Sequence, residues 1–125
     1  MTTPSDNTNN GYDRAMKLRD YFQRQTARIK STRSDLQELV SRGIGMDKMD
    51  MHRLSFIKYC IETWKSDEEH SFYTWIGEFE DPRMQIFLDD VADDTRAELF
   101  SLEMDWERLL EGYDIAAVSP FGDLF

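Results

Sequence analysis

Apolar residues recur along most of the chain at intervals of three and four, which is the spacing of one face of an α-helix. The first such series follows Asp13, a suitable N-cap, and precedes Gly43, a suitable C-terminal stop. We therefore expect one long helix over 13–42, with a kink near 31–34 as the alternative. The series consists of eight positions, with Gln25 and Thr32 as polar interruptions: Ala15, Leu18, Phe22, Gln25, Ile29, Thr32, Leu36 and Leu39.

Two shorter helices are expected to follow. Asp47 is placed to cap a helix over about 48–65, and Ser66 or Asp67 to cap a third over about 68–79. The apolar positions of both segments keep the helical spacing, so each helix is expected to bury one face.

The last helix has the clearest start signal in the chain. Asp81 is an N-cap residue and Pro82 occupies the first helical position, where proline is favoured. The helix is expected to end at Gly112, either unbroken or divided at the weak helix formers 93–95. Period-two alternation is missing throughout, so the sequence predicts an all-α bundle of four or five helices.

The two ends differ from the central helical domain, 13–112. Residues 1–12 are small and polar without apolar periodicity, which predicts a disordered N-terminal tail. Pro120 and Gly122 predict a non-helical C-terminal peptide over 113–125. No leader or long apolar span is visible, and the single cysteine excludes an internal disulfide framework; we therefore expect a cytoplasmic protein with no membrane contact.

The charge is distributed very unevenly. The total is −10, from 15 basic and 25 acidic residues. Residues 1–60 carry 11 basic and 7 acidic side chains, whereas residues 61–125 carry 4 basic and 18 acidic ones. Such asymmetry indicates a charged partner, or two halves that face each other within one bundle or dimer.

The acidic half predicts a partner-binding face on the last helix. Asp89 and Asp93 are one turn apart, as are Glu103, Glu107 and Glu111, at steps of about 6 Å. In charge and helical content this row resembles the anti-restriction and anti-CRISPR DNA mimics of phages and mobile elements. That resemblance implies competition with DNA for a basic groove, although the basic N-terminal half departs from it. The alternative is that the row is an ordinary solvated helix face.

The C-terminal peptide is the second predicted contact. Phe121, Leu124 and Phe125 are large apolar residues, and Asp123 precedes the Leu-Phe pair. The peptide resembles the short clamp-binding peptides of replication and phage late-transcription proteins. The resemblance implies docking into an apolar pocket of a protein partner, and the alternative is packing of these side chains onto the chain's own bundle.

The basic half allows a competing interpretation in which the first helix binds nucleic acid. Tyr21 and Phe22 lie among its cations and are able to stack on bases. The acidic half opposes this at long range, so nucleic acid is the less favoured partner. The same helix has a heptad seam that is compatible with self-association over 13–42. The candidate phosphate-binding residues are Arg14, Lys17, Arg24, Arg28 and Lys30.

Residues suited to catalysis do not assemble into a recognisable motif. Asp67 and His70 stand three apart, but no second such pair is present to complete a metal site. His52 and Cys60 lie about 12 Å apart along one predicted helix and cannot form a nucleophilic pair. We therefore expect no enzyme activity, metal or cofactor, and predict a regulator, adaptor or inhibitor that binds another protein.

Overall fold

The computed structural model describes the backbone of residues 4–43 and 48–111, and the side chains of 11–43 and 49–111. All regular structure in these ranges is helical, which confirms the all-α prediction. Three of these helices are long, and the remaining one has only six residues. The expected bundle of four or five helices is therefore not confirmed. The helices are α1 (Pro4–Arg42), α2 (Lys48–His70), α3 (Phe72–Gly77) and α4 (Pro82–Leu109).

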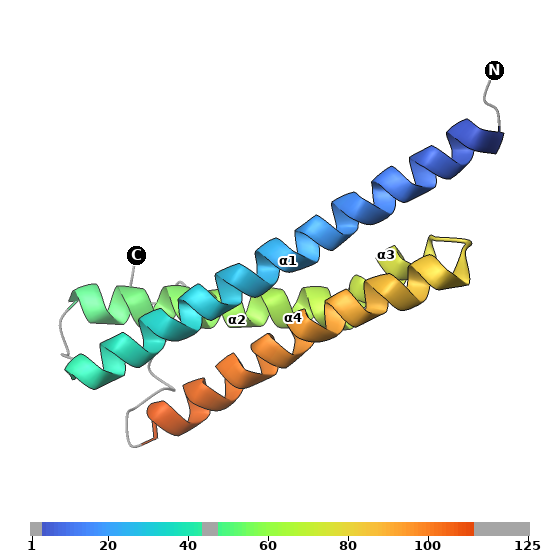
Figure 1. Ribbon diagram of the computed structural model, residues 1–125. Coiled ribbons are helices and arrows are strands. Elements are labelled where there is room, and N and C mark those ends of the chain that lie inside the picture. The colour runs from blue at the N-terminus through green and yellow to red at the C-terminus, as the bar shows by residue number, and fades with distance from the viewer. Residues whose placement is uncertain (1–3, 44–47, 112–125) are drawn as a thin grey trace.

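The three long helices form an elongated bundle (Figure 1). α1 and α4 lie side by side and run in the same direction, and they share the most extensive contact in the molecule. α2 runs back in the opposite direction and contacts both of them. The short α3 turns the chain between α2 and α4 and covers the end of the bundle nearest the start of α4.

α1 is longer than the sequence pattern predicts. It begins at Pro4, nine residues before the expected cap at Asp13, so residues 4–12 belong to this helix rather than to a separate tail. Proline is tolerated in a first helical turn, and the glycine at 11 lowers helix propensity by only about 1 kcal/mol. The helix continues through 31–34 and ends before Gly43, whose φ of 90° confirms the predicted left-handed stop.

The predicted boundary between the second and third helices is wrong. α2 runs through Ser66 and Asp67 to His70, and the break comes at Ser71. The amide of Ser71 still donates to the carbonyl of Asp67 at 2.9 Å, so the backbone ladder outweighs the local capping signal.

The predicted start of α4 is confirmed, and the helix is not divided at 93–95. The carboxylate of Asp81 accepts a hydrogen bond from the amide of Arg83 at 2.9 Å, and Pro82 follows the cap. The helix passes unbroken through 93–95 because Thr95 faces the interior and is hydrogen-bonded there.

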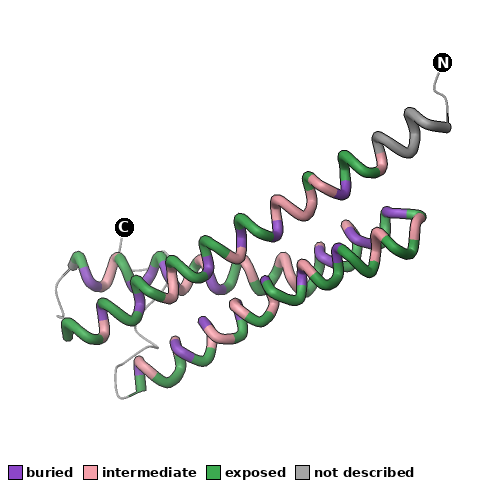
Figure 2. Tube along the Cα trace, in the orientation of Figure 1, coloured by how far each residue is buried: buried purple, intermediate pink, exposed green. Residues whose placement is uncertain are grey.

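The core consists of two apolar clusters separated by a polar layer. One cluster joins α1, α2 and α4 around Leu36 and Leu102, and the other joins α1, α3 and α4 around Phe22 and Phe72. Between them, Thr95 Oγ1 donates to the carbonyl of Phe22 at 3.1 Å and lies 2.8 Å from Thr26 Oγ1. Buried positions recur along each long helix at the predicted spacing (Figure 2).

Most of the predicted seam of α1 is buried within the single chain. Six of its eight members are buried, and Leu18 and Thr32 are half-buried. α4 supplies the principal contact, so this seam no longer indicates a second copy of the chain. Two aromatic residues, Tyr73 and Phe87, are exposed.

Candidate functional site

The predicted acidic row lies on α4 but is partly neutralised by a neighbouring cation. Nη1 of Arg96 donates to Asp93 at 2.6 Å and to Asp89 at 3.1 Å. The three side chains are spaced at three and four residues, so they share one flank of the helix. Asp89 and Asp93 are therefore already paired with Arg96, which makes them less available to a cation of a partner.

Arg96 is fixed in place by its other contacts. Its guanidinium lies over the rings of Phe72 and Tyr73, at 5.8 and 5.4 Å from their centroids. Partial burial lowers the pKa of Arg96, but the hydrogen bonds to Asp93 and Asp89 outweigh this and leave the pKa above its ordinary value. Arg96 thus connects α4 to the turn around α3 and has a structural role that the sequence pattern did not reveal.

The remaining predicted carboxylates are less constrained. Glu107 is exposed and Glu103 half-buried, and neither forms an ion pair within the described ranges. Glu111 is exposed too, but it lies beyond the end of α4 at Leu109. The five residues therefore do not form one regular, unpaired line of charge, which weakens the resemblance to a DNA mimic.

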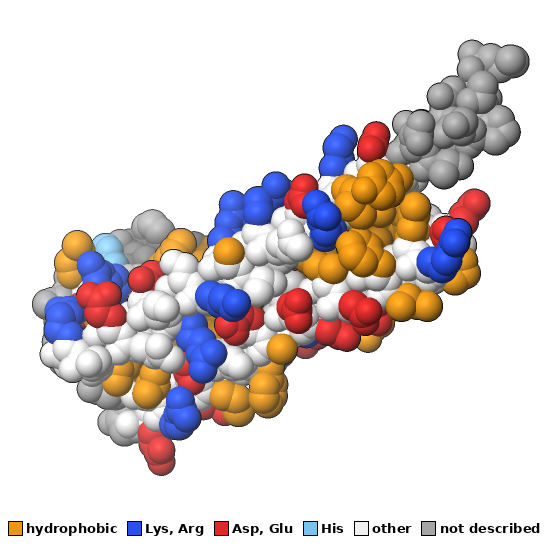
Figure 3. Space-filling view, in the orientation of Figure 1, with side chains coloured by type: hydrophobic (Ala, Val, Ile, Leu, Met, Phe, Trp, Pro, Cys, Tyr) orange, Lys and Arg blue, Asp and Glu red, His pale blue; other side chains and the backbone are white. Residues whose placement is uncertain are grey.

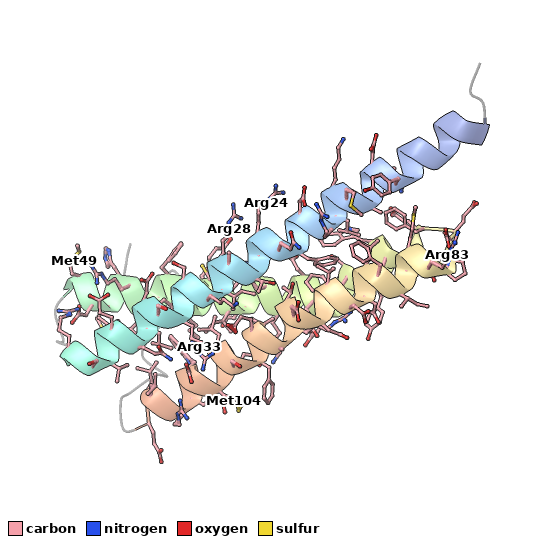
Figure 4. All side chains as sticks on the ribbon, viewed as in Figure 1. Arg24, Arg28, Arg33, Met49, Arg83 and Met104 are labelled. Carbon is pink, nitrogen blue, oxygen red and sulfur yellow. The ribbon has the colours of Figure 1, made fainter. Side chains whose placement is uncertain are left out.

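Three large apolar side chains share the outer face of α4 with these carboxylates. Ile86, Phe100 and Met104 are 64, 61 and 40% exposed. Their spacing of 14 and 4 residues places them close to one line along the helix, opposite buried Leu99 and Leu102. Apolar side chains lie along the lower edge of the molecule, where Met104 projects from α4 (Figures 3 and 4).

Sequence reasoning missed this apolar component although a signal was present. Ile86, Phe100 and Met104 fall outside the buried series of α4, and an apolar residue off the periodic positions is expected to be exposed. The acidic residues drew attention to this helix face, but the sequence prediction did not include the large apolar side chains that are exposed beside them.

Four of the five predicted phosphate-binding residues lie on one stripe of α1. Arg14, Lys17, Arg24 and Arg28 keep helical spacing, whereas Lys30 follows Arg28 by only two residues and lies on another side. Figure 4 shows Arg24 and Arg28 pointing away from the bundle. Arg14 pairs with Glu78 on the α3 side at 3.6 Å, so the stripe begins beside α3.

A buried carboxylate that the sequence pattern did not identify joins α1 to α4. Asp105 accepts hydrogen bonds from Arg33 Nε at 2.6 Å and Gln37 Nε2 at 2.9 Å, and from Arg108 at 2.8 Å. Burial raises the pKa of Asp105, but these hydrogen bonds and cations outweigh it and leave the pKa below its ordinary value. This cluster is satisfied internally and carries no sign of a ligand.

The enclosed cavity within the described part of the bundle is too small for a substrate. The cavity between Gln25, Thr95 and Arg96 has a volume of about 10 Å³, the size of one water molecule. Among the described residues no group of three potential metal ligands is assembled. Burial raises the pKa of the Cys60 thiol, which makes it a poorer nucleophile at neutral pH.

The second predicted contact, formed by Phe121, Leu124 and Phe125, lies outside the described residues. None of the described helices is long and apolar enough to cross a membrane. No protein-family model matches this sequence, and comparisons with curated proteins and with solved structures gave no significant match. The functional argument therefore depends on the surfaces of this chain alone.

Proposed function

We propose that this chain is a non-enzymatic binding protein that acts as a regulator, adaptor or inhibitor by presenting the outer face of α4 to a protein partner. The observation that carries the proposal is the exposure of Ile86, Phe100 and Met104 among carboxylates on one helix face. Monomeric proteins seldom expose large apolar side chains together unless they are used for binding.

The chemistry of this face indicates the kind of partner. An amphipathic helix binds by placing apolar anchors into a groove, while charges around them fix orientation and speed association. Glu103 and Glu107 flank Phe100 and Met104, so the complementary groove is apolar at its centre and basic at its rim. The C-terminal peptide, with Phe121, Leu124 and Phe125, is proposed to add an apolar contact to the same partner.

Site-specific crosslinking in the native host tests the proposal. A photoreactive amino acid at Ala97, which is exposed on α4, is expected to capture one protein. The double variant Phe100→Ser/Met104→Ser should lose that crosslink because the apolar anchors are removed.

The matched control is Phe56→Ser, since Phe56 is 62% exposed but lies on α2. It should leave crosslinking at Ala97 unchanged. Equal loss in both variants, or full crosslinking in the α4 variant, would contradict the proposal. Loss of the crosslink when duplex DNA is added before irradiation would favour the DNA-mimic alternative.

A further inference from the structure

An open groove of about 360 Å³ lies between α1 and α3, away from the outer face of α4. Its surface is mainly apolar with cations at the rim, and Figure 3 shows apolar side chains gathered over the first half of α1 beside Lys and Arg side chains. The lining residues are Arg14, Lys17, Leu18, Tyr21, Trp75, Glu78 and Phe79.

The floor of this groove is held by the core beneath it. Tyr21 packs edge-on against Trp75 with ring centroids 5.3 Å apart, and Phe22 packs against Phe72 directly below at 4.8 Å. Phe79 is buried, and the guanidinium of Arg14 lies 5.2 Å from its ring centroid. A preformed surface of this kind binds without the entropic cost of ordering itself.

A row of cations continues from the groove along α1. Arg14, Lys17, Tyr21, Arg24 and Arg28 follow one another at alternating steps of three and four, and the row spans about 21 Å. Within the described ranges Lys17, Arg24 and Arg28 form no ion pair. The groove therefore opens onto a line of positive charge longer than a small molecule would use.

We propose that the groove and this row bind an acidic peptide segment of a partner protein that carries a large apolar anchor. The anchor occupies the space over Leu18, Tyr21 and Trp75, and carboxylates along the segment pair with Lys17, Arg24 and Arg28. Because the row is positively charged, the bound segment is expected to be negatively charged. Because the groove is lined mainly by apolar groups, the segment is expected to place an apolar side chain in it.

A polynucleotide fits this surface less well than such a peptide. The net charge of −10 opposes a dense polyanion more than a peptide with few charges. The surface is separate from the face of α4, since Arg24 and Arg28 project from one edge of the molecule and Met104 from the other (Figure 4). The inference therefore stands independently of the proposed function.

Fluorescence titration of the full chain tests this inference. The probe is a short synthetic peptide with aspartate and glutamate on both sides of a central Leu-Phe pair. We expect saturable binding that changes the emission of Trp75, and a Trp75→Phe variant should remove most of that change. A peptide with Ser-Ser in place of Leu-Phe should bind at least about tenfold more weakly, because the anchor is missing.

Charge variants supply the decisive comparison, since the altered residues are exposed and the fold should persist. Arg24→Glu/Arg28→Glu should weaken peptide binding about tenfold or more. Lys30→Glu/Lys65→Glu changes the net charge equally, away from the row, and should weaken binding much less. Equal effects of the two double variants, no binding of the acidic peptide, or tighter binding of an oligothymidine strand would each overturn the inference.

Discussion

At the scale of single residues, buried polar groups decide how α1 and α4 fit together. Asp105 occupies a position in α4 that faces the interior and meets Arg33 and Gln37 of α1. Thr95 bonds to the backbone of α1 one layer further along. Because an unsatisfied buried polar group costs about 1–3 kcal/mol, these contacts penalise any other register of the two helices.

The Asp105 cluster makes stability depend on pH. The folded chain holds the pKa of Asp105 below its ordinary value of 3.8, so its contribution to stability is complete above the unfolded pKa. The contribution is lost as the pH falls through the lower, folded value. Asp105→Asn should therefore cost about 1–3 kcal/mol at neutral pH, and urea unfolding should show this difference shrinking below about pH 4.

The control for this comparison is Asp90→Asn, an exposed carboxylate on the same helix. It should change stability by less than about 0.5 kcal/mol at either pH. A stability gap for Asp105→Asn that stays constant down to low pH would show that the carboxylate is not the titrating group.

The polar layer is expected to have a smaller effect. Thr95→Val keeps the side-chain shape but removes the hydroxyl that donates to Phe22 and contacts Thr26. Thermal unfolding should show a loss of about 1 kcal/mol, since one net hydrogen bond disappears. An increase in stability would mean that the polar layer fixes the register of α1 against α4 but lowers the free energy of unfolding.

At the scale of secondary-structure elements, caps and packing contribute unequally. The start of α4 follows local signals, since Asp81 caps the helix and Pro82 cannot extend the preceding one. The end of α2 does not, because the helix passes two good capping residues and stops at Ser71. Local signals hold where they agree with the backbone ladder and fail at the end of α2, where the ladder continues to the amide of Ser71.

Loss of the α4 cap should be measurable. Asp81→Ala removes the acceptor of the Arg83 amide and should destabilise the fold by about 1 kcal/mol, as judged by the denaturation midpoint. Glu80→Ala alters the neighbouring exposed acid and should have little effect. Equal effects of both variants would indicate that the general charge, rather than the cap, stabilises the start of α4.

At the scale of the whole molecule, the two sides of α4 differ in exposure. Leu102 is fully buried at the centre of one cluster, whereas Phe100 lies two residues away and is 61% exposed. In a bundle of three long helices, each helix is covered by its neighbours on one side only. An outer face of α4 therefore remains uncovered. The same arrangement leaves the cation row of α1 accessible beside α3.

A matched pair of alanine variants tests this division. Leu102→Ala should cost about 2–5 kcal/mol by creating a cavity in the core. Phe100→Ala should change stability by about 0.5 kcal/mol or less and yet reduce partner crosslinking at Ala97. A large stability loss in Phe100→Ala would mean that the outer face of α4 packs within the molecule instead of binding a partner.

The sequence by itself determined the helical class, the seam of α1, and the cap at Asp81, because each depends on spacing or chemistry within a few residues. It also identified α4 as the acidic helix and named all four cations of the α1 row, together with Lys30, which lies on another side of the helix. Only the tertiary structure decided which neighbour the α1 seam packs against, since two apolar seams can pair within one chain or between copies. It likewise decided that Arg96 packs over the rings of Phe72 and Tyr73 and that the α1–α3 groove exists, because both depend on residues brought together by the turn around α3.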